Sequence, residues 1–372
     1  MPRSHMLITG MGRSGTTLLD KLLTAHPQCH FYSQPLPLLF VEVKRRFLEL
    51  HGLKPDPYPL ASYYRCGYSI HDFTRWLESY RVEESVIDSA ESLMADYSGQ
   101  LDKLQLSVDL AGMPLADLLS TCLEHTSSTQ HIVGLKEVFC EEFLPYLLKS
   151  GFAAAIILRD PRDVVASMHH GDGPHHIGSP RPILFDLRNW RKSVEFCIHL
   201  GGKANFTYLR YEDLVRSPAT SLNSVFSQLG LHGVTSDGLQ MKDGDGNDWQ
   251  GNSSFGQFAA AGISRNSVGR YAEVLGPDQI QYVESICLAE MHWAGYVASR
   301  RSDSAYMASI ANPRPDVCHR AEFAHGYSTS FDNTDFEQRR LAALIDGDMS
   351  RADEICVFSD NFPTLSSQLQ TA

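Results

Sequence analysis

The chain has 372 residues, of which 43% are hydrophobic and 20% charged, and its formal net charge is −12. This composition is typical of an ordinary globular protein of one large domain or two, and it argues against a nucleic-acid-binding protein with a basic surface. The negative charge would also repel polyanionic acceptors, which favours a neutral or cationic small molecule. Because no stretch of 18 apolar residues and no signal-like segment occurs, we expect a soluble, cytoplasmic protein that does not bind membranes.

Apolar runs alternate with amphipathic stretches, which predicts a three-layer α/β fold around a central parallel sheet, similar to that of P-loop NTPases. The predicted strands are residues 6–10, 28–33, 131–135, 153–158 and 204–209. The predicted helices are residues 16–25, 139–149, 161–170, 184–201 and 277–295, with another near 336–345. Between residues 35 and 130 the strand pattern lapses and aromatic residues are frequent. We expect this helical insertion to cap the acceptor pocket, to bury its own aromatic side chains, or to do both.

A turn with three glycines joins the first predicted strand to the first predicted helix. The glycines are Gly10, Gly12 and Gly15. Inward-pointing N–H groups and the helix start make such a turn a site for an anion. In the P-loop register G-x-x-x-x-G-K-[ST], Thr17 fits but Thr16 replaces the lysine that reaches the outer phosphates of ATP or GTP. Arg13 offers a fork of donors suited to one phosphate or sulfate, so we expect a short anion such as a phosphosulfate, held without Mg²⁺.

A second strand-to-helix segment, residues 153–167, repeats this arrangement. Arg159 follows the predicted strand at its carboxyl end, where ligands bind in open α/β sheets. Ser167 lies about two turns along the following helix, which Asp160 would cap. One guanidinium and one hydroxyl then converge on a second phosphate. The alternative is that Arg159 only pairs with Asp163.

Together these segments resemble the sulfotransferases that use 3′-phosphoadenosine 5′-phosphosulfate (PAPS). The residues from Arg13 to Thr17 match the 5′-phosphosulfate loop of that family, and Arg159 with Ser167 matches its 3′-phosphate motif. The stretch Tyr208-Leu-Arg-Tyr-Glu-Asp-Leu214 resembles a strand end whose tyrosine, Tyr211 here, lies near the adenine. The stretch Ser267-Val-Gly-Arg-Tyr271 resembles a late loop of bacterial and Golgi-type members that closes over the nucleotide.

The resemblance covers residues 6–298 and implies PAPS as cosubstrate, with no metal. It implies a sulfotransferase domain at residues 1–298 that contains the insertion at 35–130, followed by an extension at 299–372 to which we assign no role. The residues implied to bind the cosubstrate are Gly12, Arg13, Ser14, Gly15, Thr16, Thr17, Arg159, Ser167, Tyr211 and Arg270.

Sulfuryl transfer requires charge stabilisation on the bridging oxygen and a base for the acceptor. Arg13 and the loop would stabilise the leaving phosphate, and the resemblance implies a second cation at Lys136, in Gly134-Leu-Lys-Glu137. Cytosolic members carry a catalytic histidine two residues after that lysine. Glu137, close to the position of that histidine, is our first candidate for the general base. The alternative is a carboxylate that is merely salt-bridged to Lys136 or Arg13.

Golgi-type members instead use a glutamate after the second strand, where this chain has Gln34, which cannot take a proton. His169 and His170 are the second candidates for the base, because this stretch faces the acceptor in the family. With His175 and His176 they surround a Gly-Asp-Gly-Pro turn, which we interpret as a polar lid rather than a metal site. The acidic stretch at residues 243–248 lacks the later ligands of a Ca²⁺ loop and is interpreted as a turn.

These observations predict a sulfotransferase that moves the sulfuryl group of PAPS to a hydroxyl or amine of a small molecule. One alternative is an atypical P-loop kinase, against which the missing lysine at Thr16 counts. The other is a nucleotide-binding homologue that has lost catalysis, which the glutamine at Gln34 leaves open.

Overall fold

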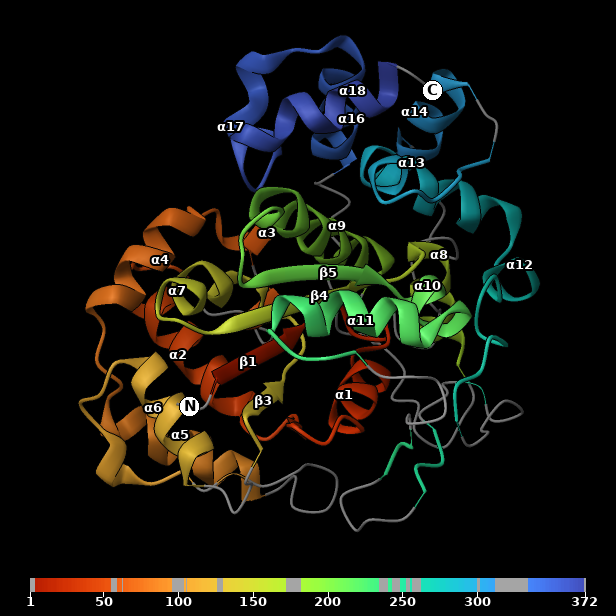
Figure 1. The fold of residues 1–372 in the computed structure, drawn as a ribbon. Helices are drawn as coiled ribbons and strands as arrows, with labels where there is room; N and C mark the ends of the chain where they lie inside the picture. The colour runs from red at the N-terminus through yellow and green to blue at the C-terminus, as the bar shows by residue number, and fades with distance from the viewer. Residues whose placement is uncertain are drawn as a thin grey trace. The chain divides into compact units, whose positions relative to one another are not determined.

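A computed structural model gives the fold of the chain (Figure 1). It describes residues 4–54, 59–61, 63–95, 104, 106–125, 130–171, 182–233, 240–242, 248–251, 255, 262–299, 302–311 and 334–370. The chain forms two compact units. Unit 1 comprises residues 1–10, 15–157 and 200–249, and unit 2 comprises residues 11–14, 158–199 and 250–372.

Unit 1 is built on a five-stranded sheet with the strand order β2-β3-β1-β4-β5. The strands are β1 (Ser4–Thr9), β2 (Cys29–Ser33), β3 (Ile132–Lys136), β4 (Ala153–Leu158) and β5 (Phe206–Arg210). The sheet is all-parallel and flanked by helices (Figure 1), so the predicted α/β class is confirmed. Every residue of β3 is buried, as expected of a parallel strand that is covered on both faces.

The strand order reverses direction at β1. From β1 the chain crosses to the edge strand β2 and returns to β3, and it then continues to β4 on the other side of β1. Ligands of open α/β sheets bind outside the carboxyl ends of the strands at such a reversal. The segments that follow β1, β3 and β4 begin at Gly10, Glu137 and Arg159, which are the positions where the sequence predicts the site.

Helices account for the described chain between β2 and β3, as predicted for the insertion. The helices of unit 1 are α1 (Thr16–Thr24), α2 (Pro37–Leu50), α3 (Tyr63–Cys66), α4 (Ile70–Ser79), α5 (Glu84–Ala95), α6 (Leu115–Glu124), α7 (Leu144–Lys149), α10 (Tyr211–Arg216) and α11 (Pro218–Gln228). Three short 3₁₀ turns accompany them: η1 (Pro59–Ala61), η2 (Val108–Leu110) and η3 (Glu141–Phe143). The helix expected at residues 139–149 begins only at Leu144, because Phe139 has a φ of +62° and Pro145 favours the first turn of a helix.

The aromatic residues of the insertion pack against one another. The Phe47 ring lies 5.3 Å from Tyr68 and 4.9 Å from Phe73, centroid to centroid. The ammonium of Lys44 lies 3.6 Å from the Phe73 ring centroid and forms a buried ion pair with Glu142 at 2.6 Å. These contacts support the reading in which the insertion buries its own aromatic side chains. Its role in an acceptor pocket stays a prediction.

Unit 2 is helical in its described part. Its helices are α8 (Pro161–His170), α9 (Ile183–Leu200), α12 (Tyr271–Val274), α13 (Pro277–Trp293), α14 (Asp303–Ala311), α16 (Thr334–Asp346), α17 (Ala352–Ile355) and α18 (Phe362–Gln370), with the 3₁₀ turns η8 (Met349–Arg351) and η9 (Ser359–Asn361). None of the described helices in either unit is long and apolar enough to span a membrane.

Residues 334–370 pack against the rest of unit 2. Leu344, Ile355, Phe362 and Leu365 form one buried apolar cluster with Ala289 of α13. These contacts place the described end of the chain in the same compact unit as α9 and α13. The division into residues 1–298 and 299–372 stays a prediction.

Candidate active site

The glycine turn after β1 is tight because neighbouring atoms leave no space for side chains. Gly10 has a φ of +144°, and a Cβ there would lie 2.8 Å from the carbonyl oxygen of Ile157. Gly15 has a φ of +99° and is the N-cap of α1, where no side chain caps the first N–H groups. Uncapped N–H groups at a helix start bind anions. The hydroxyl of Ser14 is buried and has no hydrogen-bond partner among the described residues. A ligand in this turn could therefore form a hydrogen bond with it.

Arg13 and Ser167, 154 residues apart in the chain, meet in unit 2. The Nε of Arg13 donates to the Oγ of Ser167 at 3.2 Å. The Nη1 of Arg159 donates to the carbonyl oxygen of Arg13 at 3.0 Å. Arg13 itself has a φ of +65°, an uncommon value for a residue with a side chain. Arg13 of the first motif thus contacts both residues of the second, Ser167 through its guanidinium and Arg159 through its backbone carbonyl.

The loop at residues 267–271 is attached to the same group. The Nη2 of Arg159 donates to the carbonyl oxygen of Ser267 at 2.6 Å. The carboxylate of Asp163 accepts hydrogen bonds from the N–H groups of Gly269 and Tyr271, at 2.7 and 2.9 Å. Burial raises the pKa of Asp163, although Arg159 and the two N–H groups oppose this rise. Arg270, between these anchors, forms an ion pair with Glu273.

Lys136 and Glu137 lie at the carboxyl end of β3 in unit 1, and both are about 1% exposed. The N–H of Glu137 donates to the carbonyl oxygen of Ile8 in β1 at 2.9 Å, and Cys140 donates to the hydroxyl of Thr9 at 3.0 Å. This segment is therefore fastened to the strand that leads into the glycine turn. The Oε1 of Glu137 accepts a hydrogen bond from the N–H of Leu36 at 2.8 Å.

Burial raises the pKa of Glu137 to about 8, against the opposing effects of the Leu36 N–H and Lys136. A carboxyl group with this pKa exchanges its proton near neutral pH, which is the property that a general base needs.

Gln34 is bound to Lys136 by both its side chain and its backbone. The Nζ of Lys136 donates to the Oε1 of Gln34 at 3.0 Å, and the N–H of Gln34 donates to the carbonyl oxygen of Lys136 at 2.8 Å. Gln34 also has a φ of +50°. A carboxylate at this position would lie beside the lysine ammonium.

Comparison with known proteins identifies the family. Residues 6–236 match the family model described as the Sulfotransferase family. The chain belongs to the sulfotransferase family. No curated protein matches the sequence.

Several solved sulfotransferase structures are similar to this family member. The sulfotransferase domain from the curacin biosynthetic pathway is 17% identical with a TM-score of 0.44, and the match covers 80% of this chain and 99% of that one. The sulfotransferase domain of the Synechococcus PCC 7002 olefin synthase is 18% identical with a TM-score of 0.42, covering 74% of this chain and 90% of that one. A mouse sulfotransferase complexed with PAP is 13% identical with a TM-score of 0.42, covering 81% and 86%.

The histidines after Ser167 have different environments in this sulfotransferase. His169 is fully buried, and its Nε2 lies 2.8 Å from the Oδ2 of Asp186, which is fully buried as well. This pairing fastens α8 to α9 and favours a structural part for His169. His170 is half-buried at the end of α8. His175 and His176 lie outside the described residues, as does most of the acidic stretch at 243–248.

Trp190 of α9 contacts the candidate site residue Arg159, and the sequence analysis did not identify it. Its indole N–H donates to the carbonyl oxygen of Arg159 at 2.7 Å, and its side chain is fully buried. A buried tryptophan in the middle of a helix is typical of a core residue, and its hydrogen bond spans 31 residues of sequence. The position carries no motif that would have identified it.

Tyr211, the first residue of α10, is buried, and its ring lies against Gly15 of the glycine turn. A Cβ added to Gly15 would lie 2.5 Å from a carbon of the Tyr211 ring. We therefore expect Gly15→Ala to lower the free energy of unfolding by about 2–4 kcal/mol, from the left-handed backbone and the overlap together. Urea denaturation measures this change.

Gly202→Ala is the matched control for that substitution. Gly202 has a φ of +85°, but a Cβ there has no neighbour within 4 Å, so only the backbone cost of about 1–2 kcal/mol is expected. Equal losses in the two variants would contradict the close packing of Gly15 against Tyr211.

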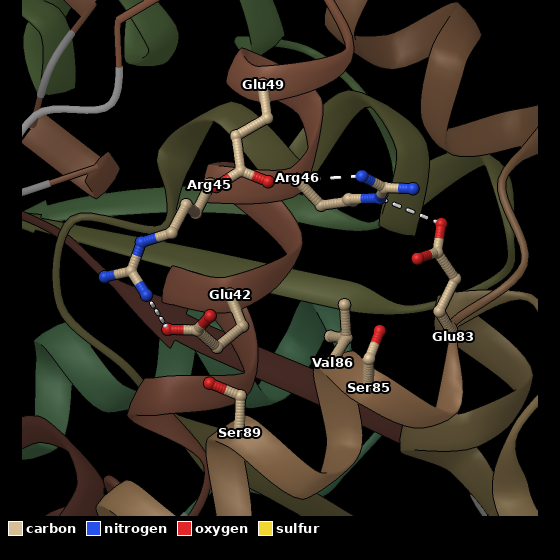
Figure 2. Close-up of a pocket in the computed structure, with 8 residues that line it drawn as sticks. All are labelled: Glu42, Arg45, Arg46, Glu49, Glu83, Ser85, Val86 and Ser89. Atoms are coloured by element: carbon tan, nitrogen blue, oxygen red, sulfur yellow. Dashed lines mark hydrogen bonds and ion pairs between the residues drawn. The ribbon is translucent and has the colours of Figure 1, made fainter.

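A separate polar cavity of about 270 Å³ lies between α2 and α5 in unit 1 (Figure 2). Its lining residues are Glu42, Arg45, Arg46, Glu49, Glu83, Ser85, Val86 and Ser89. Figure 2 shows Arg45 paired with Glu42 on one side and Arg46 bonded to Glu83 on the other, the latter at 3.0 Å. Both arginines thus have carboxylate partners within the protein, and the cavity contains none of the buried aromatic cluster.

Proposed function

We propose that this sulfotransferase transfers the sulfuryl group of PAPS to a hydroxyl or amine of a small, neutral or cationic acceptor. The observation that carries the proposal is the contact of Arg13 with Ser167 at 3.2 Å, together with the bond from Arg159 to the Arg13 carbonyl at 3.0 Å. PAPS has anionic groups at both ends of one adenosine, and the contact joins the two sequence motifs that would bind them. The acidic net charge of −12 supports an acceptor that is not polyanionic.

The donor groups of the glycine turn suit a phosphosulfate. Arg13 supplies a charged fork, the start of α1 supplies uncapped N–H groups, and Thr16 and Thr17 supply hydroxyls. These groups would stabilise the negative charge that develops on the phosphate oxygen as its bond to sulfur breaks. Thr16 replaces the lysine of nucleotide kinases, so the proposal requires no divalent ion.

Lys136 and Glu137 would act on the reacting oxygens. In the proposed reaction Glu137 accepts the proton of the acceptor, the acceptor oxygen or nitrogen bonds to sulfur, and the bond from sulfur to the phosphate oxygen breaks. Lys136 is the cation that would balance charge near the transferring group. We prefer Glu137 to His169 as the general base. The pKa of Glu137 is raised to about 8, whereas His169 is buried against Asp186.

Thermal shift with three nucleotides tests the proposal. We expect the product adenosine 3′,5′-bisphosphate (PAP), at a concentration of 100 times its Kd, to raise the free energy of unfolding by about 2.7 kcal/mol. 5′-AMP should raise it far less. Mg²⁺ should add nothing to the shift with PAP. A larger shift with Mg-ATP than with PAP would instead favour a kinase.

Turnover is tested separately, by release of PAP from PAPS with a panel of phenols, alcohols and amines. We expect release to exceed the rate with water for at least one acceptor. Tight PAP binding without transfer to any acceptor in a broad panel would instead indicate a homologue that has lost catalysis.

A further inference from the structure

A buried carboxylate joins the C-terminal part of the chain to α9. Glu337 of α16 accepts hydrogen bonds from the Nε of Arg188 at 2.7 Å and from the Nη1 of Arg191 at 2.5 Å. All three side chains are buried. Burial alone would raise the pKa of Glu337, but Arg191 and Arg188 together lower it to about 2. The carboxyl group of Glu337 is therefore ionised at neutral pH.

Trp190 lies between these two arginines in the sequence of α9 and connects the helix to the candidate 3′-phosphate residues. Its indole N–H holds the carbonyl oxygen of Arg159 at 2.7 Å. The guanidinium of Arg159 in turn holds the carbonyl oxygens of Arg13 and Ser267. One chain of direct contacts within unit 2 thus runs from Glu337 through α9 to Arg159.

A second attachment holds α9 at Glu195, about one turn after Arg191. The Oε2 of Glu195 accepts a hydrogen bond from the N–H of Val357 at 2.7 Å, and the side-chain amide of Asn361 donates to the carbonyl oxygen of Glu195 at 2.9 Å. Arg340 of α16 also forms a buried ion pair with Glu290 of α13. Residues 334–370 therefore contact α9 at Arg188 and Arg191 and again at Glu195.

We propose that residues 334–370 support the nucleotide site from outside it, because Glu337 holds α9 and Trp190 of that helix fixes Arg159 for the 3′-phosphate. Glu337 is a positioning residue in this proposal, which rests on the proposed function. Removing its charge leaves two buried arginines uncompensated, a costly state that the fold relieves by moving α9 and hydrating the arginines. Such a movement shifts the carbonyl of Arg159 and misaligns its guanidinium.

The test compares Glu337→Gln with Glu354→Gln, whose carboxylate forms an exposed ion pair with Arg339 on the same segment. Isothermal titration calorimetry, well below Tm, gives Kd for PAP and for 5′-AMP, which lacks the 3′-phosphate. We expect Glu337→Gln to weaken PAP about tenfold and AMP by less than about twofold. Glu354→Gln should change neither.

The ratio of the two affinities separates a positioning role from a purely structural one. If Glu337→Gln lowers Tm but keeps the wild-type ratio of PAP to AMP affinity, the proposal is overturned. Trp190→Phe, which keeps a ring but removes the indole N–H, should reproduce the selective loss, and an unchanged ratio in this variant would overturn the proposal even if Glu337→Gln does not fold. A wild-type chain without preference for PAP would overturn the proposed function itself, and this inference with it.

Discussion

Replacing Arg13 by glycine should lower kcat for PAP release from PAPS by about 10³-fold, with a much smaller change in the Kd of PAP. The reaction concentrates new negative charge on the phosphate oxygen that leaves sulfur, and a fixed guanidinium stabilises that charge more than it stabilises the bound donor. The hydrogen bond from the Nε of Arg13 to Ser167 would hold the guanidinium in place for this proposed role. Water, or the best acceptor found in the panel, serves as the second substrate.

Glycine is the informative substitution because of the backbone at this position. Arg13 has a φ of +65°, which glycine adopts without strain. Arg13→Ala keeps a side chain at this positive φ and therefore keeps the backbone strain. The difference in the free energy of unfolding between the two variants measures that strain. Both variants should lose kcat equally if the guanidinium is what matters.

Arg216→Ala is the control for the loss of one positive charge, because Arg216 is exposed and pairs with Asp213 at 3.1 Å. It should leave kcat within about twofold of wild type, as expected for a surface ion pair. Wild-type kcat in the Arg13→Gly variant would show that this arginine does not take part in the mechanism.

The second large effect is expected at Glu137. Glu137→Gln should lower kcat by about 10²- to 10⁴-fold, the usual contribution of a general base, while sparing the affinity for PAP. In the wild type, kcat/KM should rise with pH and level off above about 8, the pKa to which burial raises this carboxyl group. The variant should lack that rise, since it has no proton to lose.

The same residue makes stability depend on pH. The pKa of Glu137 is about 8 in the folded chain against 4.5 ordinarily, so between these values the folded chain keeps a proton that the unfolded chain releases. The free energy of unfolding should therefore fall as pH rises through this window, by at most about 1.4 kcal/mol per pH unit from this group, and level off above it. Glu137→Gln should reduce that slope, and Glu78→Gln, an exposed carboxylate paired with Lys149, should leave it unchanged.

A second substitution locates the base further. Because Gln34 accepts a hydrogen bond from Lys136 at 3.0 Å, Gln34→Glu in the Glu137→Gln background puts a new carboxylate beside the same lysine. We expect a partial recovery of kcat. If Glu137→Gln alone retains wild-type kcat, the base lies elsewhere.

The strands and most helices could be predicted because their signals are local. The apolar run Ala153–Leu158 is bounded by Gly151 and by the polar residues from Arg159 onward, and β4 matches its predicted bounds. Pro161 behind a capping Asp160 likewise marks the start of α8. The prediction failed at residues 139–149, where the positive φ of Phe139 is set by its place beside Gly10 rather than by any preference of phenylalanine.

The site was only partly predictable, for a related reason. Arg13, Ser167 and Arg159 stand in motifs whose spacing in the sequence predicts a phosphate-binding site. Trp190 and Glu337 act through hydrogen bonds to partners 31 and 146 or more residues away, and no periodicity marks such pairs. The environment of Glu137 is likewise a product of the fold, because its carboxylate accepts a hydrogen bond from Leu36, 101 residues earlier in the chain.

The attachment of residues 137–140 to the end of β1 has a consequence for how this sulfotransferase diversifies. The carbonyl oxygen of Ile8 and the hydroxyl of Thr9 accept hydrogen bonds from the N–H groups of Glu137 and Cys140, so the candidate base takes its alignment from the same strand that leads into the glycine turn. Mutations that remodel the helices between β2 and β3 need not disturb that alignment, provided that they keep the start of α2, where the N–H of Leu36 donates to Glu137. On the prediction that these helices line the acceptor pocket, descendants of this gene are expected to change acceptors more readily than the group they transfer.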